Sequence, residues 1–77
     1  MKKITMNIDG KISNRKAMEI RVSLNDLAGV VSADVAALEA KAYAYAGDKL
    51  SAESAVQRIG EVGMTASLIK EEYVGDY

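Results

Sequence analysis

Cationic and hydroxyl side chains are concentrated in one short segment, residues 10–16, which contains Lys11, Ser13, Arg15 and Lys16. A serine near a lysine can act as a nucleophile when burial removes the proton of the ammonium group. Nothing in the neighbouring sequence predicts that Lys16 is buried, and the chain contains no histidine and no cysteine. It also lacks a Gly-rich phosphate loop and paired carboxylates at a useful spacing, so the sequence indicates a protein that is not an enzyme.

The same segment could instead bind negative charge. Ser13 or Asn14 can cap a helix that starts here, which places free N–H groups and the positive end of the helix dipole beside Arg15 and Lys16. Two cations in a first turn oppose that dipole and cost roughly 0.3–1 kcal/mol each. A small anion such as phosphate, or a carboxylate on an acidic protein partner, would relieve the conflict. The alternative is that these long side chains only extend into water.

Composition limits the classes of partner. The 77 residues suffice for one small domain with a net charge of −1. Positions 1–21 hold six basic and two acidic residues, whereas positions 22–77 hold four basic and nine acidic residues. This asymmetry suits a charged protein partner. No basic run is interleaved with the four tyrosines, so we expect no nucleic acid partner.

The sequence predicts neither a membrane segment nor a cofactor. No apolar run approaches the roughly 18 residues that a spanning helix needs. The basic start at residues 1–3 leads into alternating rather than continuous apolar residues, unlike a signal peptide. We therefore expect no membrane insertion and a cytoplasmic location. Without cysteine there is no disulfide and no thiolate metal site.

Apolar periodicity predicts six elements in the order βαββαβ. Alternation and Val/Ala-rich or Ala/Tyr runs predict four strands, at residues 3–9, 30–38, 41–46 and 65–70. Helical spacing and capping residues predict two helices, from Ser13 or Asn14 to Gly29 and from Ser51 to Gly63. We expect a ferredoxin-like α+β sandwich, with both helices on one face of a four-stranded antiparallel sheet. The domain would span residues 1–70, followed by a polar, frayed tail at 71–77.

The orientation of the third strand has two possible readings. Alanine and tyrosine alternate over residues 41–46, so Tyr43 and Tyr45 share one face. We expect this face to point at the helices, where the tyrosines would offset small residues such as Ala33 and Ala37. If the tyrosines point outward instead, they would mark a binding or self-association surface.

Over residues 2–70 the chain resembles the heavy-metal-associated domain of copper chaperones, mercury-binding proteins and metal-pumping ATPases. The match runs without a gap from Gly10 through Leu24, Leu27, Gly29 and Val30, and residues 61–66 fit the final helix-to-strand junction. Family members often have an aromatic residue or lysine at the position of Met64. The resemblance implies the ferredoxin-like fold.

The family's metal motif, Gly-Met-x-Cys-x-x-Cys, is lost. Lys11 stands at the methionine position, and Ser13 and Lys16 stand at the two cysteine positions. Soft metal ions need soft ligands, which a hydroxyl and an ammonium group do not supply. The resemblance therefore implies a degenerate domain, a non-enzymatic binding or adaptor module that docks by charge complementarity. The candidate surface comprises Gly10, Lys11, Ile12, Ser13, Asn14, Arg15, Lys16 and Met64.

One alternative stays open. The chain could be a copper-type metal-binding or transport protein with atypical ligands, because the thioethers of Met6, Met18 and Met64 are soft donors. Methionine is more often a packing residue than a ligand.

Overall fold

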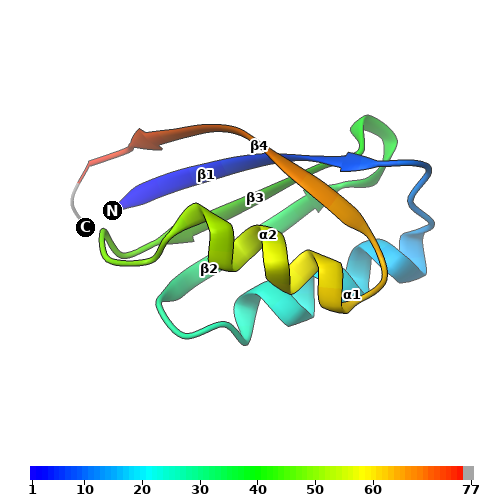
Figure 1. Cartoon of the computed structure of the whole chain (residues 1–77), viewed down its shortest axis with the longest axis horizontal. Helices are drawn as coiled ribbons and strands as arrows, with labels where there is room; N and C mark the ends of the chain where they lie inside the picture. Colours follow the sequence, from blue (N-terminus) through cyan, green and yellow to red (C-terminus); the bar gives the residue numbers. More distant parts are fainter. Residues whose placement is uncertain (76–77) are drawn as a thin grey trace.

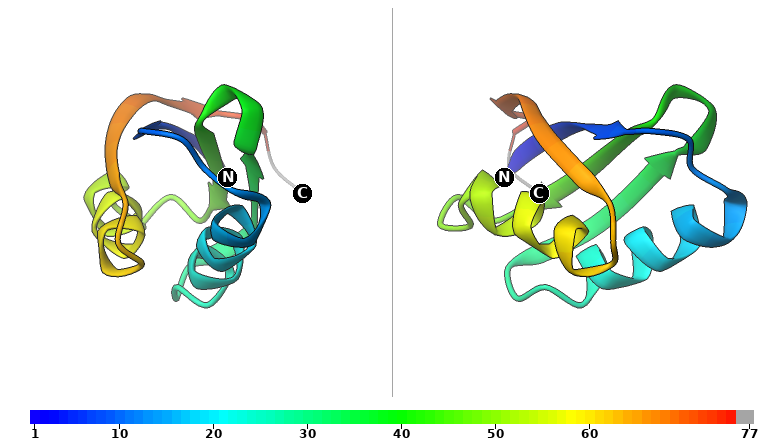
Figure 2. Two further views of the ribbon diagram at one scale, coloured as in Figure 1. Left: turned by 90° about the vertical axis from the view of Figure 1, so that its right-hand side faces the viewer. Right: turned by 45° about the vertical axis from the view of Figure 1, so that its right-hand side comes forward.

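The structure is a computed structural model that describes residues 1–75. Its elements are β1 (Lys2–Asp9), α1 (Asn14–Asn25), β2 (Val30–Ala36), the 3₁₀ turn η1 (Ala37–Glu39), β3 (Lys41–Ala46), α2 (Ala52–Glu61) and β4 (Thr65–Tyr73). The strands form one antiparallel sheet in the order β2-β3-β1-β4. Both helices cover the same face of this sheet (Figures 1 and 2). The predicted ferredoxin-like βαββαβ sandwich is confirmed.

The core lies between the sheet and the two helices. β1 alternates as expected, and Ile4, Met6 and Ile8 are fully buried beneath the helices. Ile20 of α1 and Ile59 of α2 meet them from the other layer and are equally inaccessible to water. Burying each such side chain contributes about 1.5–3 kcal/mol. No helix within residues 1–75 is both long and apolar enough to cross a membrane.

The orientation predicted for β3 is wrong. Ala42, Ala44 and Ala46 face the helices and are fully buried, whereas Tyr43 and Tyr45 lie on the other side of the sheet. The reason is that large side chains of the neighbouring strand β1 already fill the space between the sheet and the helices. Ile4 pairs with Ala44 and Met6 pairs with Ala42, so large side chains of β1 lie next to small ones of β3. We call the sheet face turned away from the helices the open face.

The second strand is shorter than predicted. It ends at Ala36, and the chain then makes the 3₁₀ turn η1, closed by the N–H of Ala40 donating to the Ala37 carbonyl at 3.2 Å. Ala40 has a left-handed backbone with φ of 53°, which an alanine adopts only at a cost in energy. The Val/Ala-rich composition does not show where the strand ends, because alanine is compatible with a helical turn as well as with a strand.

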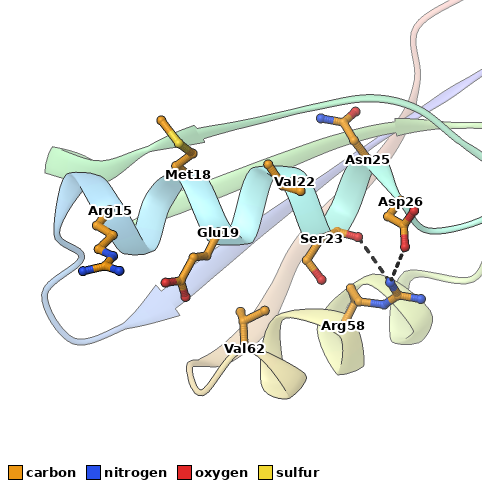
Figure 3. A pocket seen from close by; sticks show the side chains of 9 residues that line it. All are labelled: Arg15, Met18, Glu19, Val22, Ser23, Asn25, Asp26, Arg58 and Val62. Atoms are coloured by element: carbon orange, nitrogen blue, oxygen red, sulfur yellow. Dashed lines mark hydrogen bonds and ion pairs between the residues drawn. The ribbon is translucent and has the colours of Figure 1, made fainter.

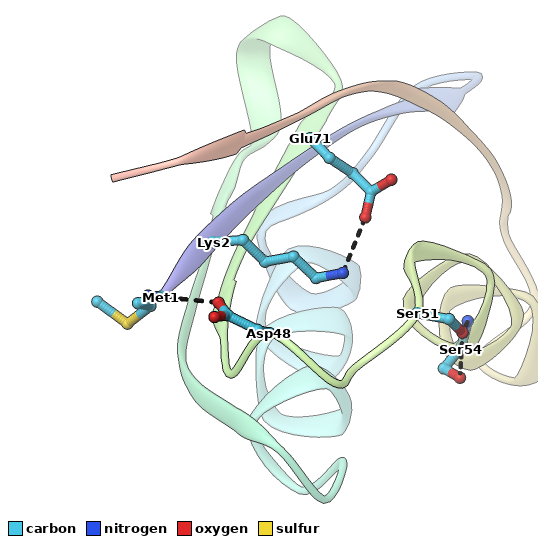
Figure 4. A network of polar contacts seen from close by, with 6 residues as sticks. All are labelled: Met1, Lys2, Asp48, Ser51, Ser54 and Glu71. Carbon is cyan, nitrogen blue, oxygen red and sulfur yellow. Dashed lines mark hydrogen bonds and ion pairs between the residues drawn. The ribbon is translucent and has the colours of Figure 1, made fainter. Parts of the chain in front are cut away.

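The predicted frayed tail is wrong for residues 71–73. β4 continues to Tyr73, with Glu71 opposite Ile4 in the register of the β1–β4 pair. The Lys2 ammonium lies 3.0 Å from the Glu71 carboxylate and ties the two strand ends together (Figure 4). The register shifts beside Thr5, which makes a bulge in this pair. The tail prediction for residues 76–77 lies outside the described residues.

Ser51 caps α2, as the sequence predicts. Its Oγ accepts a hydrogen bond from the Ser54 N–H at 3.3 Å, and the two hydroxyl oxygens lie 2.9 Å apart (Figure 4). We expect Ser51→Ala to lower the free energy of unfolding by about 1 kcal/mol, measured by urea denaturation. Ser51→Asp keeps a capping acceptor and should retain wild-type stability. Equal losses in both variants would contradict a capping role.

Candidate functional site

The predicted surface at residues 10–16 consists of the loop between β1 and α1 and the first turn of α1, and we keep the name loop at 10–16 for it. Gly10 starts it with a φ of 95° that favours glycine. Ile12 packs against the core and anchors the middle of the loop. Ser13, rather than Asn14, is the helix cap, and its Oγ accepts the Lys16 N–H at 3.1 Å. The loop is therefore held at both ends and in its centre.

Lys16 does not extend into water. Its Nζ donates to the Val62 carbonyl at 2.9 Å and to the Glu19 carboxylate at 3.0 Å, and the side chain is only 32% exposed. Val62 is the C-cap of α2, where the helix dipole is negative and favours a cation. The Lys16 ammonium group, whose residue lies near the start of α1, therefore also caps the end of α2. We call Lys16, Glu19 and Val62 the lysine clamp.

The lysine clamp corrects the expectation that Lys16 is a misplaced cation. Its α-carbon does lie in the first turn of α1, but its charge reaches a carbonyl 46 positions later in the chain. Lys16 Nζ also comes within 4.0 Å of the position that a side chain at Gly63 would occupy. The loop at 10–16 and the segment that follows α2 are therefore joined by this one side chain.

Two other cations of the loop have no such partner in the described chain. Lys11 and Arg15 are exposed, and within residues 1–75 neither makes an ion pair. Arg15 lies in the first turn of α1, which has no acidic residue. Together with the free N–H groups of that turn, they give this end of the domain a positive surface.

The three methionines that could have formed a soft site have different environments. Met6 is fully buried in β1, and Met18 is 65% exposed on α1. Met64 follows the segment bound by Lys16 but packs against the core. Across the part of the chain that the structure describes, no three His, Cys, Asp or Glu side chains gather into a group that could hold a metal ion.

A shallow groove between α1 and α2 adjoins the loop and was not predicted. Its volume is about 780 Å³, and Met18, Val22 and Val62 supply its apolar lining (Figure 3). Arg58 crosses between the helices, with Nη1 3.7 Å from the Asp26 carboxylate and 3.4 Å from the Ser23 carbonyl. The sequence feature that could have predicted this groove is the position of Met18 and Val22, which are apolar but lie off the buried stripe of α1.

Comparison with known proteins establishes the type of fold. No protein-family profile and no curated protein matches the sequence. A copper binding domain from HMA7, a P-type ATPase, matches with a TM-score of 0.88 and 24% identity, covering 95% of this chain and 100% of that one. Oxidized MerP from Ralstonia metallidurans CH34 matches with a TM-score of 0.82 and 17% identity, covering 91% of this chain and 100% of that one.

The apo form of the copper chaperone of Enterococcus hirae gives a TM-score of 0.79 and 22% identity, covering 86% of this chain and 98% of that one. Each match extends over nearly the whole neighbour, so the shared fold is complete in both chains. These likenesses confirm the heavy-metal-associated type of ferredoxin-like fold. The loop at 10–16 of this chain contains no cysteine.

Proposed function

We propose that this chain is a non-enzymatic binding or adaptor domain that contacts an acidic protein partner through its loop at 10–16. The proposal rests on the different contacts made by the three cations of the loop at 10–16. Lys16 is used internally by the lysine clamp, while Lys11 and Arg15 are exposed and unpaired within residues 1–75. Unpaired cations beside a helix N-terminus attract carboxylates.

Metal binding in the manner of the named copper proteins is disfavoured by the donor atoms. Ser13 offers a neutral hydroxyl that already accepts the Lys16 N–H. Lys16 would have to leave Val62 and Glu19 and lose its proton before it could coordinate an ion. A soft ion such as Cu(I) prefers thiolate or thioether donors to either group. A small anion at the loop is compatible with the same positive surface.

The test is a ¹⁵N–¹H NMR titration with three probes in turn, namely a glutamate-rich peptide, inorganic phosphate and Cu(I) under reducing conditions. We expect the peptide to shift the amides of residues 10–16 saturably, and Lys11→Glu combined with Arg15→Glu to abolish the shifts. Lys49→Glu, an exposed charge reversal outside this surface, is the matched control. The variant Ser13→Cys with Lys16→Cys is the positive control for Cu(I).

Each outcome separates the alternatives. Saturable Cu(I) shifts at Ser13, Lys16 and Met64 of the wild-type protein would overturn the proposal and favour a metal-binding protein with atypical ligands. Phosphate shifts without peptide shifts would make the surface an anion site rather than a protein-docking site. Equal peptide shifts in the charge-reversed and wild-type proteins would show that Lys11 and Arg15 are not the contact.

A further inference from the structure

The open face of the sheet is not covered by any element of residues 1–75 (Figure 2). Strand pairing aligns its outward residues in rows. In one row Tyr45 of β3 lies beside Lys3 of β1. In the next, Asp34 of β2, Tyr43 of β3, Thr5 of β1 and Lys70 of β4 follow one another across the sheet.

Two features of these rows are unusual for a surface in contact with water. Thr5 is only 5% exposed, and its hydroxyl has no hydrogen-bond partner within the described chain. A buried hydroxyl without a partner is unfavourable, so such groups call for an explanation. Beside it, the Lys3 ammonium lies 4.9 Å from the ring centroid of Tyr43 and 5.8 Å from that of Tyr45. The centre of the face is therefore aromatic and partly dry.

The charges of this face balance. Lys3, Lys41 and Lys70 belong to this face, as do Asp9, Asp34 and Glu72, because each shares the alternation of the tyrosines or pairs with a residue that does. The Asp34 Oδ1 also accepts the Val35 N–H at 2.9 Å, which holds this carboxylate at the edge of β2. A strongly anionic ligand such as nucleic acid needs a basic surface instead. Tyrosine anchors surrounded by charges of both signs suit a surface that binds another copy of itself.

We propose that the open face is the contact surface of a homodimer formed by two sheets packed face to face. The two-fold axis runs parallel to the strands, between β1 and β3, which agrees with the aligned packing of sheets. Rotation about this axis leaves each row at the same height along the strands and reverses the order of the strands across the face. β1 then lies opposite β3 of the second copy, and β2 lies opposite β4.

The exchange brings complementary groups together, each contact occurring twice. Lys3 comes to lie opposite Tyr45 of the second copy, so that the cation–π contact extends across the interface. Asp34 comes to lie opposite Lys70, whose side chain is 58% exposed and makes only a long 3.6 Å contact with Glu72. Thr5, whose Oγ1 is already covered within its own chain, comes to lie opposite Tyr43 and packs against it.

The expected dimer is weak. Four strands about 4.8 Å apart make a face about 19 Å wide, and an interface of this size is at the small end of the specific range. Dimerisation should therefore depend on concentration, with monomer dominant on dilution. The helix face, with the loop at 10–16, stays accessible in such a dimer, so the proposed acidic partner can be tested independently.

Analytical ultracentrifugation over about a hundredfold range of protein concentration tests the proposal. We expect the weight-average mass of the wild-type protein to rise towards twice the monomer mass. Asp34→Lys and Lys70→Glu should each abolish the rise, because each puts like charges together at both symmetry-related contacts. Lys49→Glu, in the turn that leads from β3 into α2, should behave as wild type. Circular dichroism checks that each variant is folded.

The decisive measurement uses the Asp34→Lys and Lys70→Glu variants mixed in equal amounts. In the mixed pair, the cation introduced at position 34 of one variant meets the anion introduced at position 70 of the other. The second contact joins the original Asp34 and Lys70 in their wild-type arrangement, so a heterodimer should form where neither variant alone dimerises. Tyr43→Ala should weaken both the wild-type dimer and the mixed pair. A wild-type protein that remains monomeric throughout, or a mixture that stays monomeric while wild type dimerises, would overturn the proposal.

Discussion

Truncation of Ile20 to alanine is expected to lower the free energy of unfolding by about 2–5 kcal/mol. Ile20 is fully buried and belongs to the cluster shared by the sheet and both helices. A chain of this length is expected to have a total stability of only about 4–12 kcal/mol, so the variant should lose a large fraction of it. Urea unfolding followed by circular dichroism measures the loss.

Met18→Ala is the matched control on the same helix. Met18 lies two positions before Ile20, but it is 65% exposed in the groove, and exposed substitutions usually change stability by less than about 0.5 kcal/mol. Comparable losses in the two variants would mean that the groove is a packed part of the core rather than a surface.

Replacing Lys16 with methionine is expected to lower the free energy of unfolding by about 1–2 kcal/mol. Methionine keeps the length of the side chain but removes the charged hydrogen bond to the Val62 carbonyl, a type of bond that contributes about 1.5–3 kcal/mol. Relief at the start of α1 offsets roughly 0.3–1 kcal/mol of this loss. Thermal and urea unfolding would both report the change.

Arg15→Met is the matched control for Lys16→Met. Arg15 is the neighbouring cation in the same turn, and it has no ion-pair partner within residues 1–75. Its removal should leave stability unchanged or raise it slightly, because only the unfavourable interaction with the dipole is lost. If Lys16→Met also proves neutral or stabilising, the lysine clamp contributes nothing to the fold.

Much of the fold was predictable because it rests on local patterns. The alternation of Ile4, Met6 and Ile8 predicts the buried face of β1, and Ser51 predicts the start of α2. Alternation in β3 also groups the tyrosines correctly, but it cannot tell which side of the sheet the helices cover. The choice was decided by Ile4 and Met6 of the neighbouring strand, which fill the layer beside the alanines.

The errors at the chain end and in the loop have a common cause. Glu71 suggests a solvated tail when considered alone, yet an edge strand tolerates it because Lys2 lies 3.0 Å away. Lys16 suggests a destabilised helix start, yet its partner Val62 is supplied by the end of α2. In both cases the contact joins positions far apart in sequence, which a reading of neighbours does not reveal.

The lysine clamp also has a thermodynamic consequence. A ligand that diffuses in from solution stabilises a protein by an amount that depends on its free concentration. An ammonium group on the chain itself is present at a fixed effective concentration, set only by the length of its tether. The join between the loop at 10–16 and the end of α2 is therefore not subject to mass action. Dilution or depletion of a small molecule does not release it while the domain is folded.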